Sequence, residues 1–169
     1  MKRDLDPDLS ALTSFYMGLL RGNVGNRVEY RIACPEVLDR KQLDLSVGSL
    51  RHLDDYLLAI HAQFSAVAVA SLLTTVIATT FYVGEVIRQH TPAASCDWLP
   101  PRSERLENRS MGSLEVKDFS DLLLQNTVNG EALALADDVM RRIRQGAEAP
   151  SMQALAIKAI RDVWVALPD

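Results

Sequence analysis

The stretch that decides the fold is AQFSAVAVASLLTTVIATTFYVG, from Ala62 to Gly84, which contains no charged residue. It is long enough to cross a bilayer, which takes roughly 20 apolar residues. However, it is rich in Ala, Ser and Thr, and a helix that is apolar on all sides can equally lie at the centre of a water-soluble bundle. We predict a long buried helix from about Ser65 to Gln89, with Ser65 as its cap.

A membrane-spanning role for this stretch is less well supported. Membrane insertion depends on strongly apolar residues that offset the polar ones, and Leu72, Leu73 and Ile77 are among the few present. No cluster of Lys or Arg flanks the stretch. A single-span membrane protein is therefore the least favoured of three functional hypotheses.

Signals that begin or end helices divide the rest of the chain. The predicted helix starts are Asp6-Pro7, Ser49, Asn129-Gly130 and Pro150-Ser151, and Gly146 is a predicted helix stop. The proline-bearing, polar segment 92–129 predicts a loop-rich insert that holds one β-hairpin. The predicted fold class is mainly α, a helical bundle around the long central helix that forms a single domain over residues 1–169.

Composition disfavours several classes of partner. The chain has 169 residues, a formal net charge of −4 and a sequence pI near 5.4. Nucleic-acid binding needs a local basic patch, and the arginines at 141, 142 and 144 would fan out around a helix. The first residues, MKRDLDP, carry no apolar run typical of a signal peptide. We therefore expect a cytoplasmic protein in which Cys34 and Cys96 are free thiols.

No motif in the sequence specifies a reaction, a metal or a cofactor. The patterns GxGxxG, GxxxxGK[ST] and GxSxG are absent. The histidines at 52, 61 and 90 form neither HExxH nor HxxxH, and neither cysteine belongs to a CxxC pair. The sequence therefore predicts neither a metal site nor a cofactor, and an enzymatic activity is less favoured than a binding role.

The clearest local feature is Glu85, the first charge after the chargeless stretch. Tyr82 and Arg88 lie three residues to either side of it, on one face of the predicted helix. A carboxylate beside an apolar core can act as an acid or base when its pKa is raised. The alternative is structural, in which Glu85 binds an arginine or a loop amide. We favour the structural role, and keep a pocket lined by Tyr82, Glu85, Arg88 and His90 as the second hypothesis.

The segments LDDYL (residues 53–57) and YVGEVIR (residues 82–88), followed by Trp98, resemble a pattern of small uncharacterised bacterial proteins, YxGE(V)IR…W. The resemblance covers about residues 50–100. It implies a bacterial cytoplasmic protein in which a buried helix ends in the Gly-Glu pair and an extended segment follows the tryptophan. The resemblance does not indicate any particular enzymatic activity.

The favoured hypothesis is a protein-binding module of the immunity or adaptor type. It rests on the missing catalytic motifs and on Trp98, which we expect to be exposed beside the proline-bearing loop as an interface anchor. The candidate interaction or pocket residues are Tyr82, Glu85, Arg88, His90 and Trp98. The expected partner is another protein, and self-association as a homodimer stays open.

Overall fold

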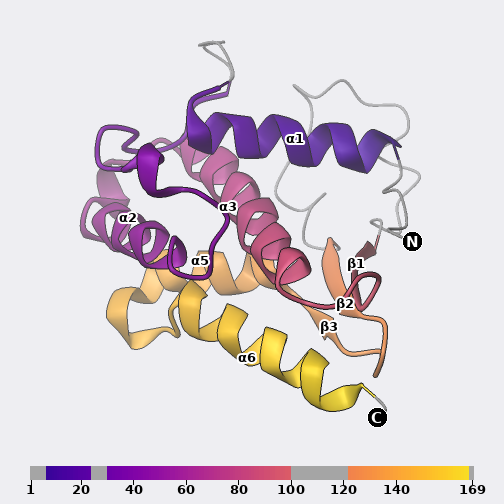
Figure 1. Ribbon diagram of the computed structural model, residues 1–169. Coiled ribbons are helices and arrows are strands. Elements are labelled where there is room, and N and C mark those ends of the chain that lie inside the picture. The colour runs from indigo at the N-terminus through magenta and orange to yellow at the C-terminus, as the bar shows by residue number, and fades with distance from the viewer. Residues whose placement is uncertain (1–6, 24–29, 100–121, 168–169) are drawn as a thin grey trace.

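The computed structural model describes residues 7–23, 30–99 and 122–167. These residues form a mainly helical fold with one small antiparallel sheet (Figure 1). The α-helices are α1 (Pro7–Arg21), α2 (Leu50–Ala62), α3 (Val69–Gln89), α5 (Leu135–Gln145) and α6 (Met152–Ala166). The 3-10 turns are η1 (Arg40–Gln42), η2 (Phe64–Ala66) and η4 (Gly146–Glu148), and the strands are β1 (Cys96–Leu99), β2 (Leu123–Asn126) and β3 (Ala132–Leu133).

Helix α3 lies between two layers of the fold. Figure 1 shows α1 crossing on one side of α3, with α5 and α6 on the other. Within the described chain, α3 is the helix that is long and apolar enough to cross a membrane, and 72% of its most apolar window is buried. Such burial is typical of the core helix of a water-soluble protein.

The start of α3 differs from the prediction. The chain extends at Val67 and Ala68, whose ψ angles are 130° and 134°, so α3 begins at Val69. Ser65 lies in turn η2 and caps nothing. From residue 62 to residue 70 the side chains are exposed, apart from the half-buried Val67. The chargeless stretch therefore has an exposed first part and a buried second part, because packing begins only at Leu72.

Other helix boundaries follow the local signals more closely. Helix α1 begins at Pro7 as predicted, while Asp6 lies outside the described residues. Helix α5 ends at Gln145, directly before the predicted stop Gly146, which has φ +60°, and Ser151 caps α6 by accepting a hydrogen bond from the Ala154 N–H. Ser49 precedes α2 as predicted, but its side chain does not cap the helix.

The prediction that Asn129-Gly130 opens a helix is wrong. Strands β2 and β3 form a hairpin, and Gly130 lies in its turn with φ +79°. The side chain of Asn126 stabilises this turn by accepting hydrogen bonds from the N–H groups of residues 128 and 129. Because β1 also pairs with β2, the sheet has three strands and reaches past the predicted end of the insert at residue 129.

Candidate functional site

Glu85, Arg88 and Trp98 meet where α3 approaches β1. One carboxylate oxygen of Glu85, Oε1, accepts hydrogen bonds from the Arg88 guanidinium at 2.7 Å and from the Trp98 indole N–H at 2.9 Å. A second guanidinium nitrogen of Arg88 lies 3.7 Å from the carboxylate of Asp97. The carboxylate of Glu85 therefore joins the last turns of α3 to β1, which is the contact expected of a structural residue.

Trp98 is buried, so the prediction that it is an exposed anchor is wrong. Its side chain is only 4% exposed, because the alternation of β1 turns Cys96 and Trp98 inward. Gly84 leaves the space that the Trp98 ring occupies, because a Cβ at residue 84 would lie 2.1 and 2.3 Å from two ring carbons of Trp98. The indole also contacts Phe81 edge to face, with the ring centroids 5.4 Å apart.

Tyr82 and His90 lie apart from this group. The Tyr82 hydroxyl is 2.8 Å from the Ser49 hydroxyl and accepts a hydrogen bond from the Leu45 N–H at 2.9 Å. Burial raises the pKa of Tyr82 above its usual value. His90 is exposed, and its Nδ1 donates to the Val86 carbonyl at 2.8 Å. The structure thus brings Glu85, Arg88 and Trp98 together but separates Tyr82 and His90 from them.

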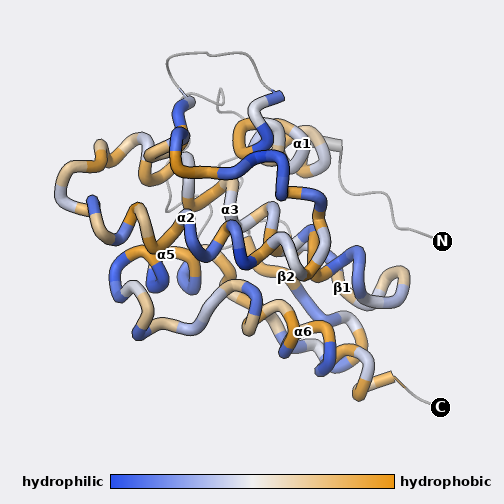
Figure 2. The backbone as a smooth tube through the Cα atoms, turned by 60° about the vertical axis from the view of Figure 1, so that its left-hand side comes forward, coloured by the Kyte–Doolittle hydropathy of each residue, from blue (hydrophilic) through white to orange (hydrophobic). Residues whose placement is uncertain are grey.

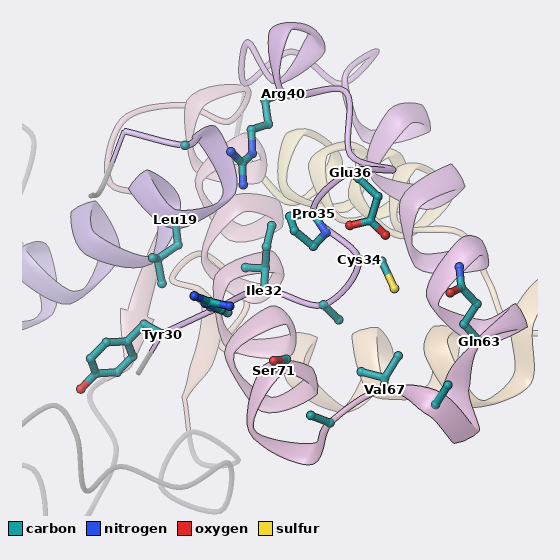
Figure 3. A pocket seen from close by; sticks show the side chains of 15 residues that line it. Leu19, Tyr30, Ile32, Cys34, Pro35, Glu36, Arg40, Gln63, Val67 and Ser71 are labelled. Atoms are coloured by element: carbon teal, nitrogen blue, oxygen red, sulfur yellow. The ribbon is translucent and has the colours of Figure 1, made fainter. Parts of the chain in front are cut away.

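Two pockets lie elsewhere on the molecule. The smaller, of about 180 Å³, lies between the sheet and α6. The larger, of about 570 Å³, lies at the start of α3 and is lined by the turn after α2, by the segment 30–36 and by Arg40 (Figure 3). Neither is lined by any of the five predicted site residues. A pocket at Glu85 therefore stays a prediction without support from either.

The wall of the larger pocket is held by two long-range hydrogen bonds. The Ala33 N–H donates to the Thr75 hydroxyl of α3 at 2.8 Å, and the Tyr56 hydroxyl of α2 donates to the Ala33 carbonyl. Cys34 follows at φ +44°, in the left-handed region. Burial raises the pKa of the Cys34 thiol, and the nearby Glu36 adds to this shift, so the thiol is poorly nucleophilic at neutral pH.

The charged residues of the larger pocket are Arg31, Glu36 and Arg40. Figure 3 shows the guanidinium of Arg40 on the side of Leu19 and Ile32, whereas Glu36 lies beyond Pro35 and beside Cys34. No ion pair joins either arginine to any residue that the structure describes. The pocket therefore has a cationic end and a separate acidic edge.

Among the described residues, no group of three or more His, Cys, Asp and Glu side chains could hold a metal ion.

No family model, curated protein or solved structure matches this chain. Both cysteines are free thiols, as predicted. Arg142 is buried and donates to the Gly146 and Ala149 carbonyls, so it adds nothing to an exposed basic patch.

An exposed apolar surface on α6 was missed by the sequence analysis. Trp164 is 56% exposed and Ile157 is 51% exposed, with the half-buried Ile160 between them. The Trp164 indole N–H donates to the His90 carbonyl at 3.1 Å. In Figure 2, α6 lies along the lower edge of the molecule, and hydrophobic and hydrophilic segments alternate along it. The sequence signal was available in the spacing i, i+3 and i+7, but this spacing also fits a core face.

Proposed function

We propose that this chain is a small bacterial cytoplasmic protein, a helical bundle arranged around α3, that binds another protein through the outer face of α6. The proposal keeps the class expected from the sequence, an adaptor- or immunity-like module, but moves its anchor from Trp98 to Trp164. The observation that carries it is an exposed tryptophan whose indole N–H is already held by the His90 carbonyl.

An anchored tryptophan is well suited to an interface. Tryptophan is enriched among the residues that contribute most to binding, and a side chain that is already ordered loses less entropy when a partner binds. The hydrogen bond to His90 fixes one edge of the indole and leaves more than half of the side chain accessible. Trp164 therefore offers a large apolar contact at low entropic cost.

The neighbours of Trp164 define the kind of partner. Ile157, Ile160 and Trp164 lie at positions i, i+3 and i+7, so they form one stripe along α6. Such a stripe packs well against an amphipathic helix of another protein, whose apolar residues fit between its ridges. The exposed Arg161, whose guanidinium lies 3.6 Å from the Asp162 carboxylate, borders the stripe and favours a partner helix with an acidic residue at its edge.

Purification of the tagged protein from its native host tests the proposal. We expect one stoichiometric partner, and Trp164→Ala should weaken its binding at least about tenfold, because truncating an anchor of this kind costs 2 kcal/mol or more. The matched control is Val69→Ala, which truncates another exposed apolar residue. Equal loss of the partner in both variants, or no loss in either, would contradict a binding surface on α6.

The mass of the purified protein in solution distinguishes a second copy from a different partner. A wild-type dimer that Trp164→Ala converts to a monomer would show that α6 pairs with itself. A wild-type monomer that captures a different protein through Trp164 would support the proposal as stated. Circular dichroism of each variant excludes unfolding as the cause.

A further inference from the structure

We infer that the larger pocket, at the start of α3, binds a small ligand that has an apolar body and one anionic group, a carboxylate or a phosphate monoester. The inference does not depend on the α6 surface, because no residue of α6 lines this pocket. It assigns a ligand site to residues that the proposed protein-binding role leaves unused.

The size and walls of the pocket suit a small ligand. Its volume of about 570 Å³ lies within the range of typical ligand sites, roughly 300–1,000 Å³. Leu19, Ile32 and Val67 supply apolar wall, and Tyr30 adds an aromatic ring. The two hydrogen bonds to Ala33 fix the segment between the pocket and α3, so that wall is formed before any ligand arrives.

The charges of the pocket favour an anion. Among its lining residues, Arg31 and Arg40 are cationic and Glu36 is the acidic one. Glu36 lies on the other side of Pro35 from Arg40 (Figure 3), and among the described residues it forms no ion pair with either arginine. A guanidinium presents paired N–H donors that match a carboxylate or a phosphate, so two arginines with no partner among the described residues favour such a group.

The first turn of α3 adds donors of the same kind. Ala68 and Ser71 line the pocket, and no side chain caps α3 at Ala68. The first N–H groups of a helix have no partner within the helix and lie at the positive end of its dipole. They strengthen the preference for an anion that the cavity and its two arginines already establish. The Cys34 thiol, whose pKa is raised, stays neutral and adds no competing negative charge at neutral pH.

The test is an NMR titration of the ¹⁵N-labelled full chain with phenyl phosphate, benzoate and the neutral benzyl alcohol. We expect phenyl phosphate or benzoate to shift the amide signals of residues 32–34 and 68–71 with a dissociation constant on the order of 1 mM, as befits so small a ligand. The stronger of the two probes identifies the anionic group. The dissociation constant for benzyl alcohol should be at least about tenfold higher, since this neutral probe has no anionic group to bind the guanidinium groups.

The variant R31Q/R40Q should weaken binding of the anionic probe at least about tenfold. The variant R31Q/R40K, which keeps the charge at residue 40, should bind the anionic probe more tightly than R31Q/R40Q does. Arg144→Gln on α5 is the matched control. Trp164→Ala should change nothing, which separates this site from the proposed protein interface. Binding that is equal for the neutral probe, unchanged in R31Q/R40Q, or undetectable for both anions would overturn the inference.

Discussion

The two ends of α3 differ in what they leave available. At the C-terminal end, the carboxylate of Glu85 binds two donors and the indole of Trp98 fills the space above Gly84. At the N-terminal end, the first turn follows an exposed segment without a side-chain cap and borders the larger pocket. The C-terminal end, which carries the charged and aromatic side chains, is packed. The N-terminal end, whose first turn consists of small and apolar residues, borders a pocket.

This contrast shows why residue type alone is a poor guide to a functional site. A carboxylate, an arginine and a tryptophan on neighbouring elements can satisfy one another and form a joint between a helix and a strand. The exposed Arg31 and Arg40, together with the uncapped start of a helix, leave their donors accessible. Whether a side chain is available to a ligand or partner depends on how it packs, and its packing is decided by residues distant in the sequence.

Gly84→Ala, which tests the packing at the C-terminal end of α3, should have the largest effect on stability. The added methyl would overlap the Trp98 ring, so we expect the free energy of unfolding to fall by about 3 kcal/mol or more, as overpacking in a rigid core does. Urea unfolding measures this loss. The matched control is Gly48→Ala, because a Cβ there would meet only the Ser46 hydroxyl at 3.5 Å.

A double-mutant cycle assigns the cost of Gly84→Ala to the indole. In a Trp98→Leu background the same substitution should cost at least about 1 kcal/mol less, since a smaller side chain frees the space. A similar loss for residues 48 and 84 would contradict the tight packing of this end.

The next largest effect compares carboxylates at the two ends. Glu85→Ala leaves the indole N–H of Trp98 without its acceptor, so we expect a loss of about 2 kcal/mol in the free energy of unfolding. Glu36→Ala at the pocket should change stability by less than about 0.5 kcal/mol, because Glu36 is exposed and forms no ion pair with the described residues. Thermal and urea unfolding of both variants measure the difference, and equal losses would remove the contrast.

Local signals in the sequence predicted much of the helical structure. Pro7, Gly146 and Ser151 act within one turn of their own helices, so their roles could be inferred without knowing the fold. Asn129-Gly130 does not begin a helix, because the same pair is common in hairpin turns and lies in one here. The burial of α3 was predictable for its second part, where Leu, Val, Ile and Phe residues recur and no charge occurs before Glu85.

The candidate sites could not be predicted from these local signals. Trp98 is buried because Gly84, on a different element, leaves room for its ring. One wall of the larger pocket is fixed by hydrogen bonds that join Ala33 to Thr75 on α3 and to Tyr56 on α2, residues far away in the sequence. Trp164 fits the same helical spacing whether its face is covered or exposed. Each site depends on tertiary contacts that a single sequence does not reveal.

The smallest expected effect concerns the tyrosine that holds the wall of the pocket. Tyr56→Phe removes the hydroxyl that donates to the Ala33 carbonyl, so we expect a loss of about 1 kcal/mol in the free energy of unfolding at pH 7. Hydrogen exchange at the Ala33 amide should also become faster, because the segment then loses its contact to α2 and keeps only the hydrogen bond to Thr75 of α3.

Alkaline pH provides an independent measure of how firmly Tyr56 is buried. Desolvation raises the pKa of its hydroxyl above the usual 10.0, so above that pH the folded protein keeps a proton that the unfolded chain loses. The free energy of unfolding should therefore be steady below about pH 10 and fall as the pH rises further. Because Phe cannot ionise, Tyr56→Phe should show a shallower fall over the same range. An unchanged slope would mean that Tyr56 is reached by solvent in the folded state, and that the pocket end of α3 is looser than its hydrogen bonds indicate.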